Sequence, residues 1–516
     1  MKKILFALIA LVAVLGLSAQ DFTIVNGTEP TSLDPHAVEG VPEHRIYVAL
    51  FEGLTINDPR TNRALPAVAE SWSFSKDYKT CTFKIRKGVT WSDGVEITAD
   101  TVVQSWVRKM DPQNAFQYAD LPAMYIEGGM DYLEGKAGPE SLKIRAVDKY
   151  TFEVKLVGPI PFFADMVSHY AFAIVPMHAI EKYGKDWVKP GKMVSNGPYV
   201  LSEWKPQEKV VVVKNNKYWD AKNVSLKKVT FIANDDINVG YNLYKSGAAD
   251  WTEAVPLELM DEVKLRKDFH VAPQYGTYYY IYNTTRKPLD DPRVRKALAM
   301  AINKDDLVNK VTRGGQIPAN SLVPPSTGYT PAKGYNFDPA AARKLLAEAG
   351  YPDGKNFPAF TILYNTSSSH KSIAEFIQAQ WKVNLGIDVS LMNQEWGTYL
   401  DTRSQSHNFD IARAGWIGDY LDPSTFLEMF ITGGTQNDGL YTNPKYDELL
   451  DKARVASGTE RFQYLMDAEK ILIDEDMAVL PLYFYVTQNL IDLDKWDGWY
   501  ANPLNIHPWK FIRPKK

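Results

Sequence analysis

Hydrophobic and polar residues alternate in short runs through the first half of the chain. The run TFKIRKGV at residues 82–89 has this period of two and is followed by the turn signal WSDG. Successive side chains of a strand point to opposite faces, so such runs predict half-buried β-strands. The same pattern predicts strands within residues 141–158, 196–204, 208–215 and 227–234. One helix is predicted among them at residues 98–110, where Thr98 is a suitable N-cap.

The hydrophobic period lengthens in the second half of the chain. After the tyrosine-rich strand YGTYYYIYN, two predicted helices open with Asp-Pro pairs, Asp291 and Pro292 before residues 293–311 and Asp338 and Pro339 before residues 340–350. A strand at residues 360–365, a helix at 371–386 and a strand at 387–396 follow. This alternation predicts an α/β fold with an additional β-rich region.

Composition and charge restrict the class of protein. A chain of 516 residues is too long for one hydrophobic core, so two or three domains are expected. The 29 tyrosines and 13 tryptophans are enough for a core and for an aromatic binding surface besides. The net charge is −4, or −4 − 2 = −6 without the two lysines that follow Met1, and no basic stripe indicates nucleic-acid binding.

The N-terminus is typical of a secretory signal peptide, predicted at residues 1–19. Two lysines precede the apolar run ILFALIALVAVLGL, which ends at the small residues Ser18 and Ala19. The alternative is a retained membrane helix, but the run is shorter than the about 20 residues that a span needs. Cys81 is the only cysteine and lies far from the leader, which excludes lipid attachment just after it and any intramolecular disulfide. We expect a soluble periplasmic protein.

Motifs of the common enzyme classes are absent from the sequence. The eight histidines form no H-E-x-x-H zinc motif, and no P-loop, G-x-G-x-x-G loop or G-x-S-x-G nucleophile elbow occurs. We therefore expect no catalytic activity, metal or cofactor. The carboxylate pair of a glycoside hydrolase is spatial rather than sequential. A secreted glycosidase thus stays open as an alternative, with Asp419 and Asp422 or Glu39 and Glu43 as its pair.

One segment places two opposite charges in an apolar, aromatic run. In NFDIARAGWIGDYLDP, residues 408–423, Arg413 and Asp419 stand six positions apart. In a strand they would lie on one side with Gly415 and Ile417, about 20 Å apart from 6 × 3.3 Å. An extended peptide of four or five residues spans about 13–17 Å by the same rise. Its ammonium would then suit Asp419, and its carboxylate would lie towards Arg413.

The strand can also hold such a peptide through its main chain. Strand edges pair with extended ligands, and the glycines at positions 415 and 418 let a ligand backbone approach closely. The alternative is that the two charges pair with each other or with groups elsewhere in the fold. The spacing alone leaves both interpretations open.

Short motifs in one order along almost the whole chain resemble those of a known family. They are LDPH, EGVPE, LFEGL, AESW, WSDG, NGPYVL, DPRVRKAL, KLLAEAGY, LYNTSSSHK, NQEW, LDTR, ARAGW with DY, and LPLYFYV. The chain resembles a periplasmic oligopeptide-binding protein, the substrate-binding component of a peptide ABC importer. The resemblance implies a two-lobed periplasmic-binding-protein fold of the α/β class that closes over an extended peptide of about two to five residues.

The resemblance also implies roles for individual residues. Asp419 matches the carboxylate that binds the peptide ammonium. Groups that meet the peptide carboxylate at different peptide lengths match Arg413, Arg403 and His370. Main-chain pairing with the peptide is implied at Glu39, Val41, Gly415 and Ile417. The resemblance implies that Trp396, Trp416 and Tyr485 form walls of water-filled pockets that accept different peptide side chains.

Some positions depart from the family pattern. Better-known members carry a cysteine pair at the positions read here as Gly276 and Ile417. A tyrosine that helps to hold the ammonium is read here as Gln104, which we include among the candidate peptide-binding residues. An acidic strand residue is read as Ile281. These departures leave peptide length and side-chain preference open, whereas the Asp419 anchor is retained.

The resemblance divides the chain into three parts, whose names are kept below. Lobe I combines residues 20–51, 186–273 and 484–516, the β-rich inserted domain spans residues 52–185, and lobe III spans residues 274–483. The hinge strands are expected near residues 273 and 483, with the ligand between the lobes.

The expected partners are a short peptide and the permease subunits of an ABC transporter in the inner membrane, with no nucleic acid, and a monomer is expected. Within the same fold, a murein tripeptide, a dipeptide, haem or an oligosaccharide remains an alternative ligand. Asp419 favours a ligand with an amine over a neutral sugar. A peptide-handling chaperone is a further alternative, and it would bind unfolded chains broadly.

Overall fold

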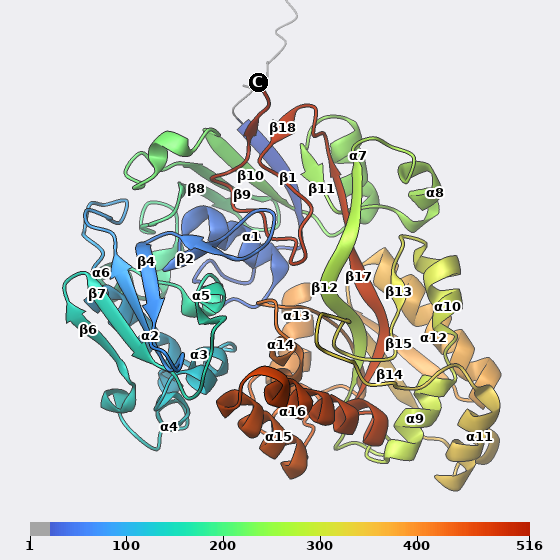
Figure 1. Ribbon diagram of the computed structural model, residues 1–516. Helices are drawn as coiled ribbons and strands as arrows, with labels where there is room; N and C mark the ends of the chain where they lie inside the picture. Colours follow the sequence, from blue (N-terminus) through green and yellow to red (C-terminus); the bar gives the residue numbers. More distant parts are fainter. Residues whose placement is uncertain (1–20) are drawn as a thin grey trace, which may run out of the picture.

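One long mixed sheet runs through both lobes of the protein. The computed structural model describes residues 21–516 (Figure 1), so the predicted signal peptide at residues 1–19 lies outside the described residues. The sheet has the strand order β15-β14-β16-β12-β17-β11-β1-β10-β9-β8, with β13 beside β17. Its two central strands are long, β12 at Phe269–Tyr282 and β17 at Val479–Ile491, and they pass from lobe I into lobe III.

Lobe I holds one end of this sheet. Strand β1 pairs in parallel with β10 and β11, whereas β8, β9 and β10 form an antiparallel meander. The elements are β1 (Asp21–Gly27), α1 (Val41–Leu50), β8 (Tyr199–Lys205), β9 (Lys209–Lys214), β10 (Lys228–Ala233), α7 (Ile237–Lys245), β11 (Trp251–Thr252), α8 (Met260–Val263), β18 (Trp496–Asp497) and β19 (Arg513–Pro514). The predicted strands at residues 196–204, 208–215 and 227–234 are confirmed as β8, β9 and β10.

The inserted domain has a separate antiparallel sheet of order β4-β5-β7-β6. Thr98, the predicted N-cap, forms a capping box with Thr101, because the Thr98 backbone N–H donates to the Thr101 hydroxyl at 3.1 Å and the two hydroxyls lie 3.4 Å apart. The elements are β2 (Thr55–Asn57), β3 (Ala64–Pro66), β4 (Ala69–Phe74), β5 (Thr80–Ile85), α2 (Ala99–Met110), α3 (Asp120–Tyr125), α4 (Gly129–Leu133), β6 (Ile144–Asp148), β7 (Thr151–Lys155), α5 (Phe163–Met166) and α6 (Met177–Tyr183).

Lobe III packs helices around the other end of the long sheet (Figure 1). Its predicted strand–helix–strand unit is confirmed, because β14 and β15 pair in parallel on either side of α12. The elements are α9 (Pro292–Met300), α10 (Lys304–Asp306), β13 (Ile317–Pro318), α11 (Pro339–Glu348), β14 (Phe360–Asn365), α12 (Ser368–Leu385), β15 (Val389–Gln394), α13 (Trp396–Leu400), β16 (Ile411–Ile417), α14 (Ser424–Leu427), α15 (Pro444–Val455) and α16 (Gly458–Lys470).

The single helix predicted at residues 293–311 is wrong. The chain leaves the helix at Ala301, and Asn303 begins a new one by accepting a hydrogen bond from the backbone N–H of Asp306 at 3.0 Å. Asparagine is a strong N-cap, so its local preference overrides the hydrophobic period that continues through it. No helix among residues 21–516 is long and apolar enough to cross a membrane.

The inserted domain touches lobe III through buried polar groups. The Tyr125 hydroxyl at the end of α3 donates to a Glu428 carboxylate oxygen at 2.8 Å and lies 3.0 Å from the hydroxyls of Tyr420 and Ser424. The Thr435 backbone N–H donates to Asp120 at 3.0 Å. These contacts join parts of the chain about 300 residues apart, so they form only when the inserted domain and lobe III meet.

Candidate ligand-binding site

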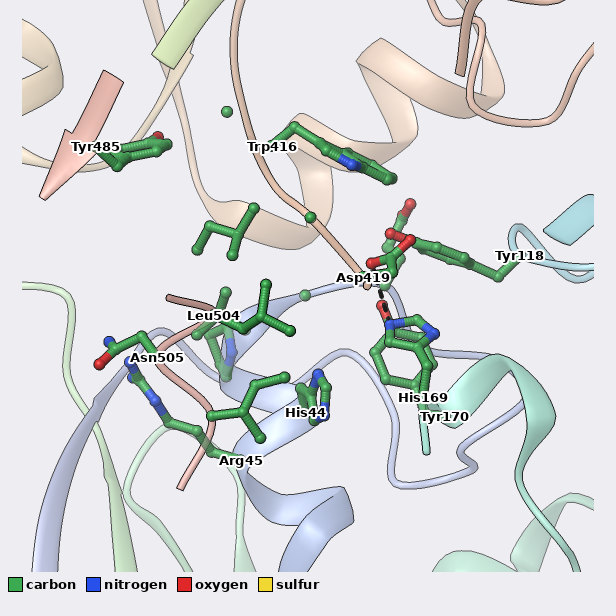
Figure 2. Close-up of a pocket in the computed structure, with 18 of the residues that line it drawn as sticks. His44, Arg45, Tyr118, His169, Tyr170, Trp416, Asp419, Tyr485, Leu504 and Asn505 are labelled. Carbon is green, nitrogen blue, oxygen red and sulfur yellow. Dashed lines mark ion pairs between the residues drawn. The ribbon is translucent and has the colours of Figure 1, made fainter. Parts of the chain in front are cut away.

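A cavity of about 310 Å³ lies where lobe I, the inserted domain and lobe III meet (Figure 2). This volume is within the range of about 300–1,000 Å³ that small-ligand pockets occupy. Ten of the twelve predicted site residues line it: Asp419, Arg413, Arg403, Glu39, Val41, Gly415, Ile417, Trp416, Trp396 and Tyr485. The structure therefore brings together residues that are up to 446 positions apart, from Glu39 to Tyr485.

Asp419 has a buried carboxylate with no cationic partner. It lies two residues after the end of β16, and its backbone N–H donates to the Thr425 hydroxyl at 3.0 Å. The only basic group paired with the carboxylate in the described chain is the His169 imidazole, at 3.2 Å. Burial, and next the nearby Asp120 carboxylate, raise the pKa of Asp419 well above its ordinary value. A cation in the cavity would relieve this unfavourable charge.

Aromatic groups surround the Asp419 carboxylate on two sides. Figure 2 shows Trp416 and Tyr118 on one side of it and His169 and Tyr170 on the other. The rings of Tyr118 and Trp416 are stacked with centroids 6.0 Å apart, and those of His169 and Tyr170 are 3.9 Å apart. Such rings favour a cation over their faces and exclude water from the carboxylate.

Arg413 is the opposite charge, and it too has no ionic partner in the part of the chain that the structure describes. Its guanidinium donates to the Tyr485 hydroxyl at 3.0 Å and to the Asn365 side-chain oxygen at 3.4 Å. Its central carbon lies 4.8 Å from the centre of the Tyr278 ring. The Nε–H is buried without an acceptor. Arginine stays protonated in proteins, so an anion in the cavity would find an unpaired cation here.

The main chain of β16 presents an open edge to the cavity. Strand β14 pairs with β16 only at Ile411 and Ala412, which leaves the later residues unpaired on that side. On the other side, the Gly418 N–H donates to the Tyr275 carbonyl on β12 at 2.8 Å. Hydrogen-bonded pairs alternate in an antiparallel ladder, so the N–H and C=O groups of Gly415 and Ile417 point away from β12. They are free to pair with an extended ligand.

Arg403 differs from Arg413 because its charge is already matched. Its Nε lies 2.7 Å from an oxygen of Asp438, and Nη1 donates to the Tyr399 hydroxyl at 3.2 Å. Glu39 lines the same part of the cavity. Burial raises the pKa of Glu39 to about 7, although the positive charge of Arg403 opposes this shift. In this part of the cavity the charge of Arg403 is therefore opposed by the carboxyl groups of Asp438 and Glu39.

Two predicted site residues do not line the cavity. Gln104 is exposed on α2, where its side chain donates to Asp100 at 2.6 Å, so the position read as a replaced tyrosine is outside the site. His370 is half-buried beside Tyr278, with Nδ1 3.2 Å from the Tyr278 hydroxyl.

The other departures from the family pattern lie in β12. Gly276 stands directly opposite Ile417 in the β12–β16 ladder, so the two positions are neighbours. Ile281 is 3% exposed and packs in the core of lobe III, away from the cavity lining.

Several cavity residues escaped the sequence analysis. The inserted domain supplies Tyr118, His169 and Tyr170, and Tyr279 of β12 also reaches the cavity. Lobe I supplies a further set: His44, Arg45, Trp251, Leu504, Asn505 and His507. Apart from Tyr279, which belongs to the tyrosine-rich strand YGTYYYIYN, each of these residues stands in an ordinary mixed segment, so no local pattern marks it. Only the packing of three separate parts of the chain brings these residues to one cavity.

Comparison with known proteins agrees with this geometry. The model of the bacterial extracellular solute-binding proteins, family 5 (middle region), matches residues 63–438. The periplasmic oligopeptide-binding protein OppA of Salmonella typhimurium is 40% identical over 488 residues, which cover 92% of this chain and 89% of that protein. The structure of Haemophilus influenzae OppA in complex with RPPGFSPFR has a TM-score of 0.91 at 33% identity, covering 96% of this chain and 99% of that one.

A third relative shows which arrangement of the lobes this structure has. The Escherichia coli murein tripeptide-binding protein MppA gives a TM-score of 0.91 at 36% identity, covering 96% of this chain and 99% of that one. An unliganded open form of MppA gives only 0.64 at the same identity, covering 96% and 97%. The lobes here thus stand as in the peptide complex and not as in the open form. By fold, sequence and extent of match, the chain belongs to the bacterial extracellular solute-binding proteins of family 5.

Proposed function

We propose that the protein binds short peptides of about two to five residues between its lobes and delivers them to an ABC peptide permease. The observation that carries this proposal is the pair of largely buried charges without ionic partners in one cavity, Asp419 and Arg413. A free peptide is a zwitterion, so its ammonium and its carboxylate supply the two missing partners. Hydrogen bonds between charged groups are stronger than those between neutral groups. They can therefore give affinity without any contact to the side chains of the peptide.

The main chain supplies the second part of the proposed recognition. The outward N–H and C=O groups of Gly415 and Ile417 suit an extended peptide lying along β16 as an added strand. Val41, at the first turn of α1, lines the cavity from lobe I. Helix N–H groups in a first turn lack partners within the helix and are free to bind a ligand carbonyl. We assign Trp396, Trp416 and Tyr485 to the walls of the side-chain pockets.

Two further candidates for the peptide carboxylate, Arg403 and His370, have secondary roles in this proposal. Arg403 already pairs with Asp438, so it would meet a peptide carboxylate only as part of that pair. His370 acts through Tyr278, whose ring contacts Arg413. Arg413 is therefore the preferred anchor of the peptide carboxylate.

A murein tripeptide is the second candidate ligand, favoured by the 39% identity to E. coli MppA over 477 residues, which cover 90% of this chain and 87% of that protein. Haem or an oligosaccharide fits the two unpaired charges less well, because haem and neutral sugars lack an ammonium group, whereas a dipeptide falls within the proposed range of peptide lengths. Neither of the two carboxylate pairs considered for a glycosidase is available for catalysis, because one member of each pair is already bound or buried. Asp422 is bound by both Arg461 nitrogens at 2.7 and 2.8 Å, and Glu43 is 2% exposed.

The proposal includes the organisation and location of the protein. Lobe I, the inserted domain and lobe III would close about the two long strands β12 and β17 as hinges. Residues 1–19 would act as a signal peptide that directs the chain to the periplasm without lipid attachment, since Cys81 is buried in β5. We propose a monomer with no enzymatic activity.

Calorimetric titration of the mature protein tests the proposal. The ligands are a free tetrapeptide, its N-acetylated form, its C-amidated form and a murein tripeptide. We expect tight binding of the free peptide, which is lost on acetylation and in Asp419→Asn but kept in the matched control Asp401→Asn, whose side chain is exposed outside the cavity. Equal binding of free and acetylated peptide would remove the ammonium role from Asp419. Binding of the murein tripeptide alone would favour the second candidate.

A further inference from the structure

The Asp419 carboxylate and the His169 imidazole meet across the closed cleft. Asp419 belongs to lobe III, whereas His169 belongs to the inserted domain and caps the short 3-10 helix at Tyr170–Phe172. The distance between Nε2 and Oδ1 is 3.2 Å, and the side chains are 3% and 10% exposed (Figure 2). Because the two residues lie 250 positions apart on different bodies, this contact exists only in the closed arrangement.

The protonation of the imidazole follows from its other contact. Nδ1 of His169 accepts a hydrogen bond from the Ala171 backbone N–H at 3.3 Å. A backbone N–H can only donate, so Nδ1 carries no proton. Burial lowers the pKa of His169 well below its ordinary value, which keeps the ring neutral. The single ring proton therefore lies on Nε2, and Nε2–H donates to Oδ1 of Asp419.

The surroundings offer Asp419 no other side-chain donor in the described chain. The titratable groups that face this pair are Tyr118, Tyr170, His44, Lys109, Asp120 and Glu39. Lys109 is engaged with the His36 carbonyl at 2.9 Å, and Asp120 accepts from the Thr435 N–H at 3.0 Å. The His44 ring packs edge-on against the His169 ring at 5.4 Å, which fixes the imidazole in position.

We propose that His169 is a positioning residue for the ammonium subsite: its Nε2–H holds Oδ1 of Asp419 and leaves Oδ2 aimed at the ammonium of the bound peptide. This inference rests on the proposed peptide-binding function. Both domains then contribute to the subsite, because the inserted domain supplies the hydrogen-bond donor and lobe III supplies the carboxylate. A peptide then binds tightly by its ammonium only once the inserted domain has closed onto lobe III.

Two variants separate hydrogen bonding from packing. His169→Phe keeps the ring volume without a donor, and His169→Gln restores an N–H donor at the position of Nε2. We expect His169→Phe to weaken binding of the free tetrapeptide by about 10- to 100-fold, as for the loss of a hydrogen bond to a charged group. His169→Gln should recover most of this loss. Neither variant should alter the weak binding of the N-acetylated peptide.

The pH profile gives a readout that a structural role would not move. Binding an ammonium requires the ionised carboxylate, so affinity falls as Asp419 becomes protonated. Losing a donor destabilises the carboxylate, so the midpoint should move to higher pH in His169→Phe and return in His169→Gln. In the Asp419→Asn background, His169→Phe should have no further effect, because the two residues act as one unit.

Nitrogen-15 spectra of histidine-labelled wild-type protein test the tautomer without relying on a variant that folds. The His169 signals, assigned with His169→Gln, should show a protonated Nε2 and a bare Nδ1 in the peptide-bound state. A proton on Nδ1, or equal peptide affinity in wild type and His169→Phe, would overturn the positioning role while leaving peptide binding intact. If the wild-type protein binds no tetrapeptide at all, the proposed function fails and this inference fails with it.

Discussion

The two unpaired charges of the cavity predict that the empty protein resists closure. We expect Asp419 and Arg413 to be hydrated in an open arrangement, whereas the closed structure holds both charges without ionic partners. The effective cost of burying an unpaired ion in a protein is several kcal/mol. A bound zwitterion offsets this cost, since an ammonium at about 3 Å from a carboxylate gains about 5 kcal/mol at an effective dielectric constant of 20.

Neutralising both groups should therefore close the protein without a ligand. The variant is Asp419→Asn with Arg413→Met, which keeps side-chain size and removes both charges. If the double variant removes only about 3 kcal/mol of the cost of burying the two charges, the equilibrium constant for closure rises about 150-fold. A closed state populated at about 1% then becomes the major state. The closed fraction of each single variant should lie between those of the wild type and the double variant.

Electron–electron double resonance between spin labels on α4 and α15 measures this change, because these helices belong to the inserted domain and lobe III. Wild type should show a long distance without peptide and a short one with saturating tetrapeptide. The double variant should show the short distance without peptide, and the matched surface pair Asp401→Asn with Arg343→Met should behave as wild type. A double variant that stays open, or an empty wild type that is already closed, would refute the reasoning.

Acidification should also favour closure of the empty protein. The pKa of Asp419 is raised in the closed state relative to the solvated one, so the closed state binds the proton more tightly. Closure of the empty protein is thus favoured below the open-state pKa and loses this contribution as pH rises through the closed-state value. The same label distance, recorded from neutral to acid pH, should shorten in wild type and stay constant in Asp419→Asn.

Three further predictions concern single side chains. A Cβ at Gly415 would overlap the Tyr485 hydroxyl, so Gly415→Val should weaken peptide binding at least about tenfold by calorimetry, and unchanged affinity would contradict the proposed ligand path. Tyr125→Phe removes the hydroxyl that donates to Glu428 across the closed interface. It should raise the peptide dissociation constant by about 5- to 20-fold with the preference for free over acetylated peptide unchanged, and a loss of that preference would contradict a role in closure alone. Burial lowers the pKa of Lys304 from 10.5 to about 7, so its stability contribution is present above pH 10.5 and is lost as pH falls towards 7. Urea unfolding of Lys304→Met should show a gain over wild type that grows from pH 10 to pH 7 by at most about 4 kcal/mol, and a constant difference would contradict the shift.

Local signals predicted most of the fold because they depend on few residues. The Asp291 and Asp338 side chains each accept from backbone N–H groups of the following first turn, as the Asp-Pro pairs predict. Residues 293–311 show the limit of the hydrophobic period. It continues through Asn303, although the backbone there restarts as a new helix. A periodic pattern records which face is buried, and it does not record where the hydrogen-bond ladder breaks.

The hydrophobic pattern alone predicted the candidate site only where its residues follow one another in sequence, and the distant residues Glu39, Val41, Trp396, Arg403 and Tyr485 were predicted only by the family resemblance. Arg413, Gly415, Ile417 and Asp419 are spaced along one strand and its end, so alternation alone places them together. The family tyrosine that helps to hold the ammonium was read as replaced by Gln104, which lies outside the cavity, whereas Tyr118 lines the cavity near Asp419. A loop residue such as Tyr118 has no periodic neighbours that fix its direction.

The inserted domain explains why the second half of the ammonium subsite was not predictable. His169 and Tyr118 reach Asp419 because the inserted domain packs against lobe III, through Tyr125 to Glu428 and through Asp120 to Thr435. A contact across such an interface depends on the relative placement of two bodies, which no local pattern encodes. Under the proposed function, the same dependence would make closure selective for the ligand. A ligand that lacks an ammonium leaves Asp419 buried and unpaired, so the closed state that completes the site is also the state that penalises the wrong ligand.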